Sequence, residues 1–244
     1  MSDAGPLRSR KGFLERPLRR LLVETKLSDL EQRAVRGLRA DRVVLAKGLE
    51  PASELEGVFF ILDGWACEAR VLTGGRRQIF NLLLPGDVAG CLPDGATIRY
   101  QPQIFALTRV IAVDAGSLCG LEAIHQAMAE AQRNARNRTF DHIVRLGSHT
   151  AYESVAHLLL EVHGRLAEVG LASDGRFELP IGQDQIGQLL GLSGMHVNRT
   201  MAKLKGAGWL KMGPGWVALP RLSELAELVD YGPTSLDERP RTQA

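Results

Sequence analysis

The side chains best suited to chemistry are hydrogen-bond donors in the last third of the chain. Asn198 and Arg199 stand next to each other, and Lys203 and Lys205 follow within two helical turns. Arginine can pair with the O6 and N7 atoms of guanine, and asparagine can pair with adenine or with a phosphate. Lysines bind phosphates and position a protein without reading sequence. These residue types together indicate duplex DNA as a ligand.

The charge of this region also fits a polyanion. Residues 185 to 223 contain five basic residues and no Asp or Glu, in a chain of net charge +2, so the remainder carries −3. The basic residues are Arg199, Lys203, Lys205, Lys211 and Arg221. Positive charge is therefore concentrated where phosphates would lie.

Two short helices around a glycine must position these side chains. Ile186, Leu189 and Leu190 recur at helical spacing and predict a first helix over residues 183–190. Gly191 suits a left-handed turn. Ser193 is a good N-cap for a second helix over about residues 193–205. The inner stripe of this second helix is predicted to be Val197, Met201 and Leu204.

The opposite face of the second helix is the candidate DNA-binding surface. A glycine-rich segment over 206–217 follows it and predicts a wing hairpin, so the pattern is typical of a winged helix-turn-helix. His196 lies on the flank of the helix, where a phosphate contact and a plain surface role are both open. The candidate DNA-binding residues are Ser193, Gly194, Met195, His196, Asn198, Arg199, Lys203 and Lys205.

The N-terminal half has a different pattern. Short β-like runs alternate with turn signals between residues 41 and 114 and predict a jelly roll or barrel. These runs are Arg42–Leu45, Val58–Leu62, Ala66–Val71, Arg77–Leu84, Gln103–Leu107 and Val110–Asp114. Helices are predicted over 17–38, 118–146 and 151–167, with Gly147 as a hinge. At 244 residues, we expect about two domains, each with its own core.

The helix over 118–146 carries small and apolar residues at roughly coiled-coil spacing. They form a candidate dimer seam, which Arg138 interrupts, and packing of this helix on its own β domain is the alternative. The candidate dimer residues are Leu121, Ile124, Met128, Ala131, Ala135 and His142.

Composition narrows the class of protein. Hydrophobic residues make up 45% and charged residues 24%, as in soluble globular proteins. No apolar run is long enough for a bilayer, and the N-terminus lacks the apolar core of a signal peptide, so we expect a cytoplasmic protein without a membrane partner. Three scattered cysteines predict neither disulfides nor a metal site. Residues 1–16 and 232–244 are predicted to be disordered or flexible.

The order of these elements resembles the Crp/Fnr superfamily of bacterial transcription regulators. The most specific likeness is Leu-Pro-Ile-Gly-Gln-Asp-Gln-Ile-Gly-Gln-Leu-Leu-Gly-Leu-Ser (179–193) with Val197-Asn198-Arg199-Thr200, and Leu-Leu-Pro-Gly-Asp-Val-Ala-Gly (83–90) supports it. The resemblance implies an α+β fold, with a cyclic-nucleotide-binding-like β-roll over 17–117, a dimerisation helix over 118–147 and a winged helix-turn-helix over 148–231. It also implies a homodimer on a two-fold symmetric promoter site, with RNA polymerase as a further partner.

The effector pocket departs from this resemblance. Cyclic-nucleotide-binding members carry a glutamate directly after the glycine that is Gly90 here, and this chain has Cys91. Their Arg-Ser pair for the cyclic phosphate falls on Tyr100 and Gln101, with Arg99 adjacent. Burying a phosphate without a charge partner is expensive, so we expect a vestigial pocket without tight cAMP or cGMP binding. Arg99 substitutes only if the loop register slips by one residue.

Other cofactors are not expected either. No cysteine precedes Cys67, so the N-terminal ligands of an iron–sulfur sensor are missing. All six histidines follow the β-roll, which disfavours a haem ligand, although His142 and His149 can face a dimer seam. Cys91 is either redox-active or a small buried residue. What remains resembles the effector-lacking FixK-like branch.

The recognition helix departs from the resemblance at Met195. The well-known branches carry a glutamate there that accepts from cytosine, whereas Met195 offers apolar contact, for example to a thymine methyl.

Two other functions compete with DNA binding. An enzyme in the β-roll cleft is disfavoured, because residues 41–114 contain no histidine and no catalytic motif stands out. A helix-turn-helix that binds protein is disfavoured by the acid-free basic segment.

Overall fold

The computed structural model describes residues 28–37, 42–48, 51–52, 57–90, 103–118 and 120–232. The predicted disordered N-terminus and the start of the predicted helix over 17–38 lie outside these residues. The same is true of the tail from residue 233. Within the described residues, no helix combines the length and apolarity needed to cross a bilayer.

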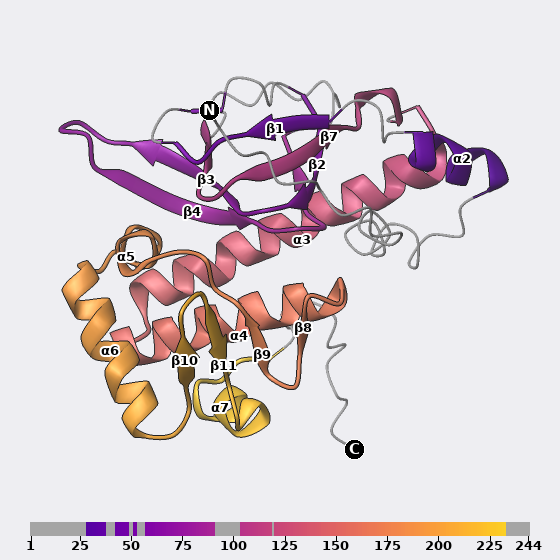
Figure 1. Cartoon of the computed structure of the whole chain (residues 1–244). Coiled ribbons are helices and arrows are strands. Elements are labelled where there is room, and N and C mark those ends of the chain that lie inside the picture. The colour runs from indigo at the N-terminus through magenta and orange to yellow at the C-terminus, as the bar shows by residue number, and fades with distance from the viewer. Residues whose placement is uncertain are drawn as a thin grey trace, which may run out of the picture.

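Figure 1 shows the β-roll strands on one side of the long helix α3 and the helix-turn-helix elements on the other. The N-terminal elements are α2 (Asp29–Gly37), β1 (Arg42–Leu45), β2 (Phe59–Asp63), β3 (Ala66–Val71), β4 (Arg77–Leu83), β5 (Val88–Ala89), β6 (Gln103–Ala106), β7 (Val110–Asp114) and the 3-10 turn η2 (Gly116–Leu118). The C-terminal elements are α3 (Glu122–Gly147), α4 (Ala151–Glu168), β8 (Ala172–Ser173), β9 (Arg176–Glu178), α5 (Gln183–Leu190), α6 (Gly194–Gly206), β10 (Lys211–Gly213), β11 (Trp216–Ala218) and α7 (Leu222–Leu228).

The predicted mixed fold is confirmed. The β-roll consists of two antiparallel sheets, with strand orders β1-β7-β2-β5 and β4-β3-β6. A third antiparallel sheet, β10-β11-β9-β8, belongs to the C-terminal part. All six predicted strands are present to within a residue or two, and the two-residue strand β5 was not predicted.

The strands of the β-roll are apolar on both faces because both faces are covered. In β2, Phe59 and Ile61 point between the two sheets, where they meet Leu83 and Ala112. The alternate residues, such as Phe60, pack outward against α3. This alternation explains why the run from residue 58 to residue 62 is apolar without interruption.

The outer face of the other sheet packs on the C-terminal half of the chain. Ile79 and Phe105, from β4 and β6, share one buried cluster with Leu158 of α4 and Leu189 of α5. The same cluster continues to Val197 of α6. The β-roll therefore has a core of its own between its two sheets and a second core, on the outer face of this sheet, that it shares with the helix-turn-helix.

The predicted seam of α3 is largely occupied by its own chain. Ile124 and Met128 are buried against Phe60 and Val113 of the β-roll, and His142 is buried beside β4. Leu121, Ala131 and Ala135 are half-buried. The packing of α3 on its own β domain, named above as the alternative, therefore accounts for the fully buried residues of the stripe.

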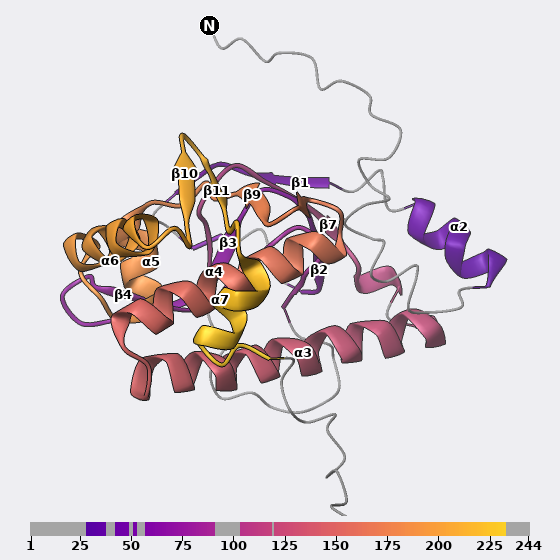
Figure 2. The same ribbon diagram turned by 90° about the horizontal axis from the view of Figure 1, so that it is seen from below.

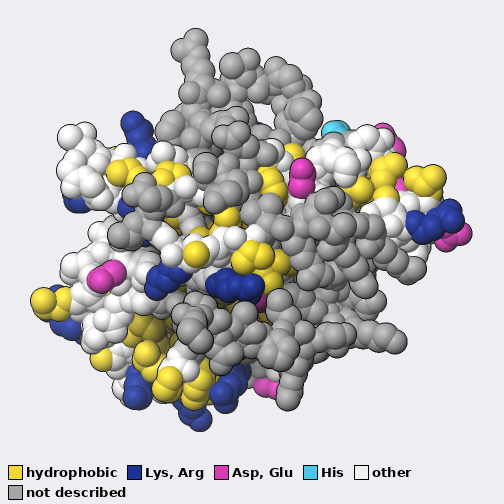
Figure 3. Space-filling view, turned by 45° about the horizontal axis from the view of Figure 1, so that its top comes forward, with side chains coloured by type: hydrophobic (Ala, Val, Ile, Leu, Met, Phe, Trp, Pro, Cys, Tyr) yellow, Lys and Arg dark blue, Asp and Glu magenta, His cyan; other side chains and the backbone are white. Residues whose placement is uncertain are grey.

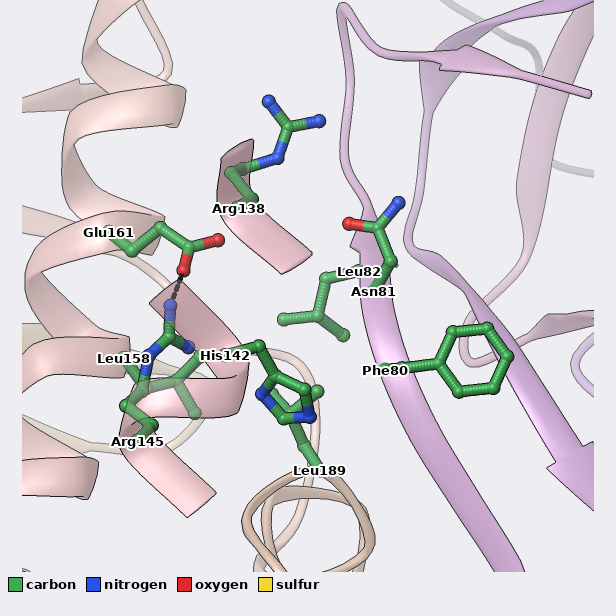
Figure 4. Close-up of a pocket in the computed structure, with 9 residues that line it drawn as sticks. All are labelled: Phe80, Asn81, Leu82, Arg138, His142, Arg145, Leu158, Glu161 and Leu189. Atoms are coloured by element: carbon green, nitrogen blue, oxygen red, sulfur yellow. Dashed lines mark hydrogen bonds and ion pairs between the residues drawn. The ribbon is translucent and has the colours of Figure 1, made fainter. Parts of the chain in front are cut away.

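A buried ionic cluster joins the β-roll to α3 and α4. Figure 4 shows the part of it in which Arg145 pairs with Glu161, with Arg138 nearby. The Arg165 guanidinium pairs with Asp87, which follows β4, and with Glu161 at 2.9 Å. It also donates to the Leu82 carbonyl oxygen at 2.6 Å. Arg145 of α3 pairs with Glu161 from the other side, and Arg138 lies 3.7 Å from Asp87. Three segments that are far apart in sequence are thereby held together.

The electrostatics of this cluster favour its charged form. Burial alone would raise the pKa of Glu161, but the guanidinium groups of Arg145 and Arg165 outweigh it and lower the pKa to about 2. The cluster is therefore charged at neutral pH. A buried charge with its partners in place is tolerated, whereas the loss of one partner leaves an uncompensated charge.

Asp87→Asn tests this cluster. The change leaves Arg165 buried with one counter-charge fewer, and we expect the free energy of unfolding in urea to fall by about 3–5 kcal/mol. The control Glu130→Gln removes the exposed pair between Glu130 and Arg133 and should cost less than about 1 kcal/mol. Equal small losses for both variants would contradict a central role for Asp87.

The buried histidines make stability depend on pH. Burial, assisted by the charge of Arg145, lowers the pKa of His142 and of His157 from 6.5 to about 4. Between these values the unfolded chain binds more protons. The contribution of each neutral histidine to the free energy of unfolding is therefore greatest above pH 6.5. It decreases as the pH drops toward 4, by up to about 3 kcal/mol per histidine. His142→Gln should flatten this dependence in thermal unfolding, whereas His125→Gln, at an exposed position of α3, should not.

Candidate nucleic-acid interface

The turn between α5 and α6 has the geometry expected from its glycines. Gly191 ends α5 with φ 66° and ψ 24°, the left-handed conformation that glycine adopts without strain. The Leu192 amide donates to the Gly187 carbonyl oxygen at 3.0 Å. A Cβ atom on Gly187 would lie 2.4 Å from the Leu192 carbonyl oxygen. Gly191 is therefore favoured by the left-handed turn, and Gly187 is required by the close approach of the backbone that follows the turn.

The second helix is capped and anchored as predicted. The Ser193 hydroxyl accepts from the His196 amide at 3.2 Å, which satisfies one of the free amides of the first turn. Val197, Met201 and Leu204 are buried in the shared core, so the predicted inner stripe is confirmed. Thr200 is buried as well. The packing of the inner face in the core thus fixes the direction in which the outer face of α6 points.

All eight predicted DNA-binding residues lie on or directly before α6, and none is buried. Met195 is the most open, with 73% of its surface exposed. Gly194 and His196 are half-buried. The exposed members are Ser193, Met195, Asn198, Arg199, Lys203 and Lys205. Figure 3 shows Lys and Arg side chains gathered at the lower left, over the part that carries α6 and the wing, with few acidic side chains among them.

The predicted wing is the hairpin of β10 and β11. Its register pairs Lys211 with Ala218 and Gly213 with Trp216. The carbonyl oxygen of Gly215, at its tip, accepts from the Leu179 amide at 3.0 Å, which ties the wing to the segment that leads into α5. Lys211 is exposed on the first strand of the wing.

Two arginines beside the helices are stacked on tryptophans. Arg221 lies 3.7 Å from the Trp209 ring centroid and donates to the Ala207 carbonyl oxygen at 2.9 Å. Arg221 therefore stabilises the C-terminal end of α6. From the sequence it was counted only as one of the five positive charges of the basic segment. Arg176 lies 3.9 Å from the ring of Trp216, on the wing.

Two residues of α5 reach the outer face of α6, and sequence reasoning missed both. Asn198 Nδ2 donates to Gln183 Oε1 at 3.1 Å. The Asp184 carboxylate lies over the start of α6, since a Cβ atom on Gly194 would be 2.3 Å from Asp184 Oδ1. In the sequence, Asp184 comes directly before the acid-free segment. Its place at the start of α5 is the one signal in the sequence that its side chain lies near α6.

Of the predicted effector pocket, only Gly90 lies within the described residues. It has φ +85°, and a Cβ atom there would lie 1.7 Å from the Gly57 carbonyl oxygen, so the close approach of two chain segments requires glycine. Its carbonyl oxygen accepts from Gln132 of α3 at 3.4 Å. The other members, Cys91, Arg99, Tyr100 and Gln101, lie outside the described residues.

Metal and redox chemistry find little support in the described part of the chain. That part contains no group of three or more His, Cys, Asp or Glu that could hold a metal ion. Burial raises the pKa of the Cys67 thiol to about 12, so this thiol is unreactive. The centroids of the His149 and His157 rings lie 5.2 Å apart in a tilted arrangement, within one chain.

A helix-turn-helix with a wing, packed on a β-roll and a long helix, defines a DNA-binding regulator with an N-terminal sensor-like domain. Comparison with known proteins supports this assignment. The family model for the Crp-like helix-turn-helix domain matches residues 153–228.

Comparisons over longer parts of the chain extend the likeness beyond the helix-turn-helix domain. The nitrogen fixation regulation protein FixK of Bradyrhizobium diazoefficiens is 32% identical over 162 residues, 65% of this chain and 68% of that protein. FixK of Azorhizobium caulinodans is 28% identical over 168 residues, 64% of each chain. The structure of FixK2 from Bradyrhizobium japonicum superposes with a TM-score of 0.61 at 28% identity, covering 77% of this chain and 96% of that one. The chain belongs to the Crp/Fnr superfamily of transcription regulators and is FixK-like, which confirms the resemblance drawn from its motifs.

Proposed function

We propose that the protein is a homodimeric transcription regulator that reads a two-fold symmetric DNA site with α6 in the major groove. The carrying observation is the outer face of α6, whose own side chains include no acidic residue, are mostly exposed and are held in orientation by a buried inner face. The Asp184 carboxylate of α5 lies over the first turn of this face. Two such helices in a dimer contact half-sites about 34 Å apart, one turn of duplex. RNA polymerase is the expected further partner, and the cytoplasm is the expected location.

The roles of the α6 side chains follow from their chemistry. Arg199 pairs with a guanine, Met195 contacts a thymine methyl, and Asn198 reads an adjacent base. Lys203 and Lys205, further along the helix, contact phosphates. Ser193, Gly194 and His196 lie at the end of the helix that enters the groove and approach the backbone of the DNA.

Each domain has the role that the resemblance to the Crp/Fnr superfamily implies. Residues 148–231 bind DNA, residues 118–147 form the dimer helix, and residues 17–117 form a β-roll that has lost cyclic-nucleotide binding. No enzymatic activity is assigned, and FixK relatives are named as regulators. Gly90 keeps a structural role in closing the β-roll, which accounts for its presence without a nucleotide.

The dimer surface of α3 lies nearer its C-terminal end than the sequence suggested. Phe140, Ile143 and Val144 are exposed on one face of the helix, although all three are large and apolar. Figure 2 shows α3 along one edge of the molecule, with this end beside the start of α4. A second copy of the same face is the natural cover for this patch, because dimeric readout requires the two DNA-binding units to be joined nearby.

The first test is the selection of random duplex DNA by the purified protein, with and without cell extract. Enrichment of a palindrome by the protein alone supports an effector-independent regulator. Enrichment only with extract means that the β-roll still senses a small molecule. A lack of any enrichment contradicts sequence-specific binding.

Arg199→Ala and Lys203→Ala separate base readout from phosphate binding. Arg199→Ala should reduce the preference for the selected site over random DNA by roughly 5- to 150-fold, the worth of one bidentate pair. Lys203→Ala should weaken binding to both DNAs alike and lower the salt dependence by about one ion. Competitive gel shifts at several salt concentrations measure both quantities. Identical losses for the two variants on both DNAs would count against the assignment.

Ile143→Asp tests the dimer face. Ile143 is 58% exposed, so the change should leave the fold intact while placing two carboxylates in the dimer contact. We expect the mass in analytical ultracentrifugation to shift from dimer to monomer at micromolar concentration. The matched control Val71→Asp, at an exposed apolar position of β3, should leave the dimer unchanged. A dimer that survives Ile143→Asp would move the interface elsewhere.

A further inference from the structure

The outer face of α6 is connected to α5 through a pair of carboxamides. Asn198 Nδ2 donates to Gln183 Oε1 at 3.1 Å, across 15 positions of sequence. Asn198 is exposed on α6, next to Arg199, whereas Gln183 is half-buried as the first residue of α5. The bond therefore joins an exposed side chain of α6 to a half-buried side chain at the start of α5.

This bond matters because a carboxamide has two different ends. A free asparagine can turn its amide by half a turn, which exchanges the donor and the acceptor that it presents. In this bond Gln183 presents its oxygen, and the nitrogen of Asn198 faces it. One hydrogen of Nδ2 is used in this bond, while the second hydrogen and Oδ1 remain available to a ligand.

The remaining donor and acceptor match one base. Asparagine pairs with adenine by accepting from N6 and donating to N7. Guanine presents acceptors at both N7 and O6, so it cannot supply the donor that Oδ1 needs. Met195 lies three residues earlier, which places it beside Asn198 on the helix surface, and its apolar side chain suits the methyl group of a thymine.

We propose that Gln183 is a positioning residue that holds Asn198 in the orientation that selects adenine, beside the guanine read by Arg199. Gln183 sets the base preference without touching the base itself. The inference rests on the proposed function, since it names the base that this DNA-binding face prefers at one position of the half-site. The first helix of the motif thereby shares in sequence readout.

The test uses the full-length protein and the half-site that it selects from random duplex DNA. Each of the four bases is placed in turn at the position that loses discrimination in Asn198→Ala, and the affinities are compared. We expect the intact protein to prefer adenine by roughly 10-fold, and Gln183→Ala to lose most of this preference. In the Asn198→Ala background, Gln183→Ala should change the base preference no further.

Two substitutions distinguish orientation from a general effect on folding or charge. Gln183→Glu can only accept, so Asn198 keeps its orientation. It should retain the adenine preference while binding all DNA more weakly. Gln183→Lys can only donate and attracts Asn198 Oδ1 instead. It should lose the adenine preference even though its charge strengthens binding to all DNA.

The possible failures are distinct. If the intact protein selects no sequence at all, the proposed function is wrong. If it selects a site but shows no adenine preference at the Asn198 position, or if Gln183→Ala keeps that preference, the role of Gln183 is wrong and the proposed function stands.

Discussion

The pairing of Asp87 with Arg165 is the contact on which the arrangement of the two halves depends. Asp87 is buried in the turn after β4, where its carboxylate also accepts from the Leu84 amide at 2.7 Å. Arg165 comes from α4, the helix that carries the DNA-binding unit. One charged contact therefore fixes the conformation of the turn after β4 and the distance between this turn and α4. The apolar residues around it can then pack in a single way.

Two hydrogen bonds join the β-roll to the helix-turn-helix in addition to this anchor. Arg77 of β4 donates to Gln188 Oε1 at 3.0 Å, and Gln78 donates to the Leu189 carbonyl oxygen at 3.2 Å. Both acceptors lie on α5, the helix behind the recognition helix. A continuous set of contacts therefore runs from β4 through α5 to α6.

The local parts of the fold could be predicted from sequence, because their causes are local. The Gly191 turn, the Ser193 cap and the apolar stripes of α5 and α6 follow from residue types at fixed spacing. The stripe of α3 could be seen, but what covers it could not. An apolar residue such as Ile124 has the same pattern whether it meets its own chain or a second copy. Which surface a helix faces is decided by the whole tertiary arrangement.

The candidate site shows the same division. Residues on α6 were predictable because one helical face can be drawn from one segment of sequence. Gln183 was not, because its bond to Asn198 depends on the angle at which two helices cross. Arg221 was counted as a charge, and only its stacking on Trp209 shows that it serves the structure. The contacts between different helices and strands are thus the part of a site that cannot be predicted from a single sequence.

The bare backbone at Gly194 couples two positions, 184 and 194, of the proposed DNA-binding face. Any side chain at Gly194 must displace the Asp184 carboxylate that now lies over it. The outcome of a mutation at one of these positions therefore depends on the residue at the other, and the order in which they change matters. A descendant of this protein reaches a larger residue at the start of the recognition helix most readily after position 184 has become smaller. Its DNA preference thus evolves along restricted paths, set by two helices rather than one.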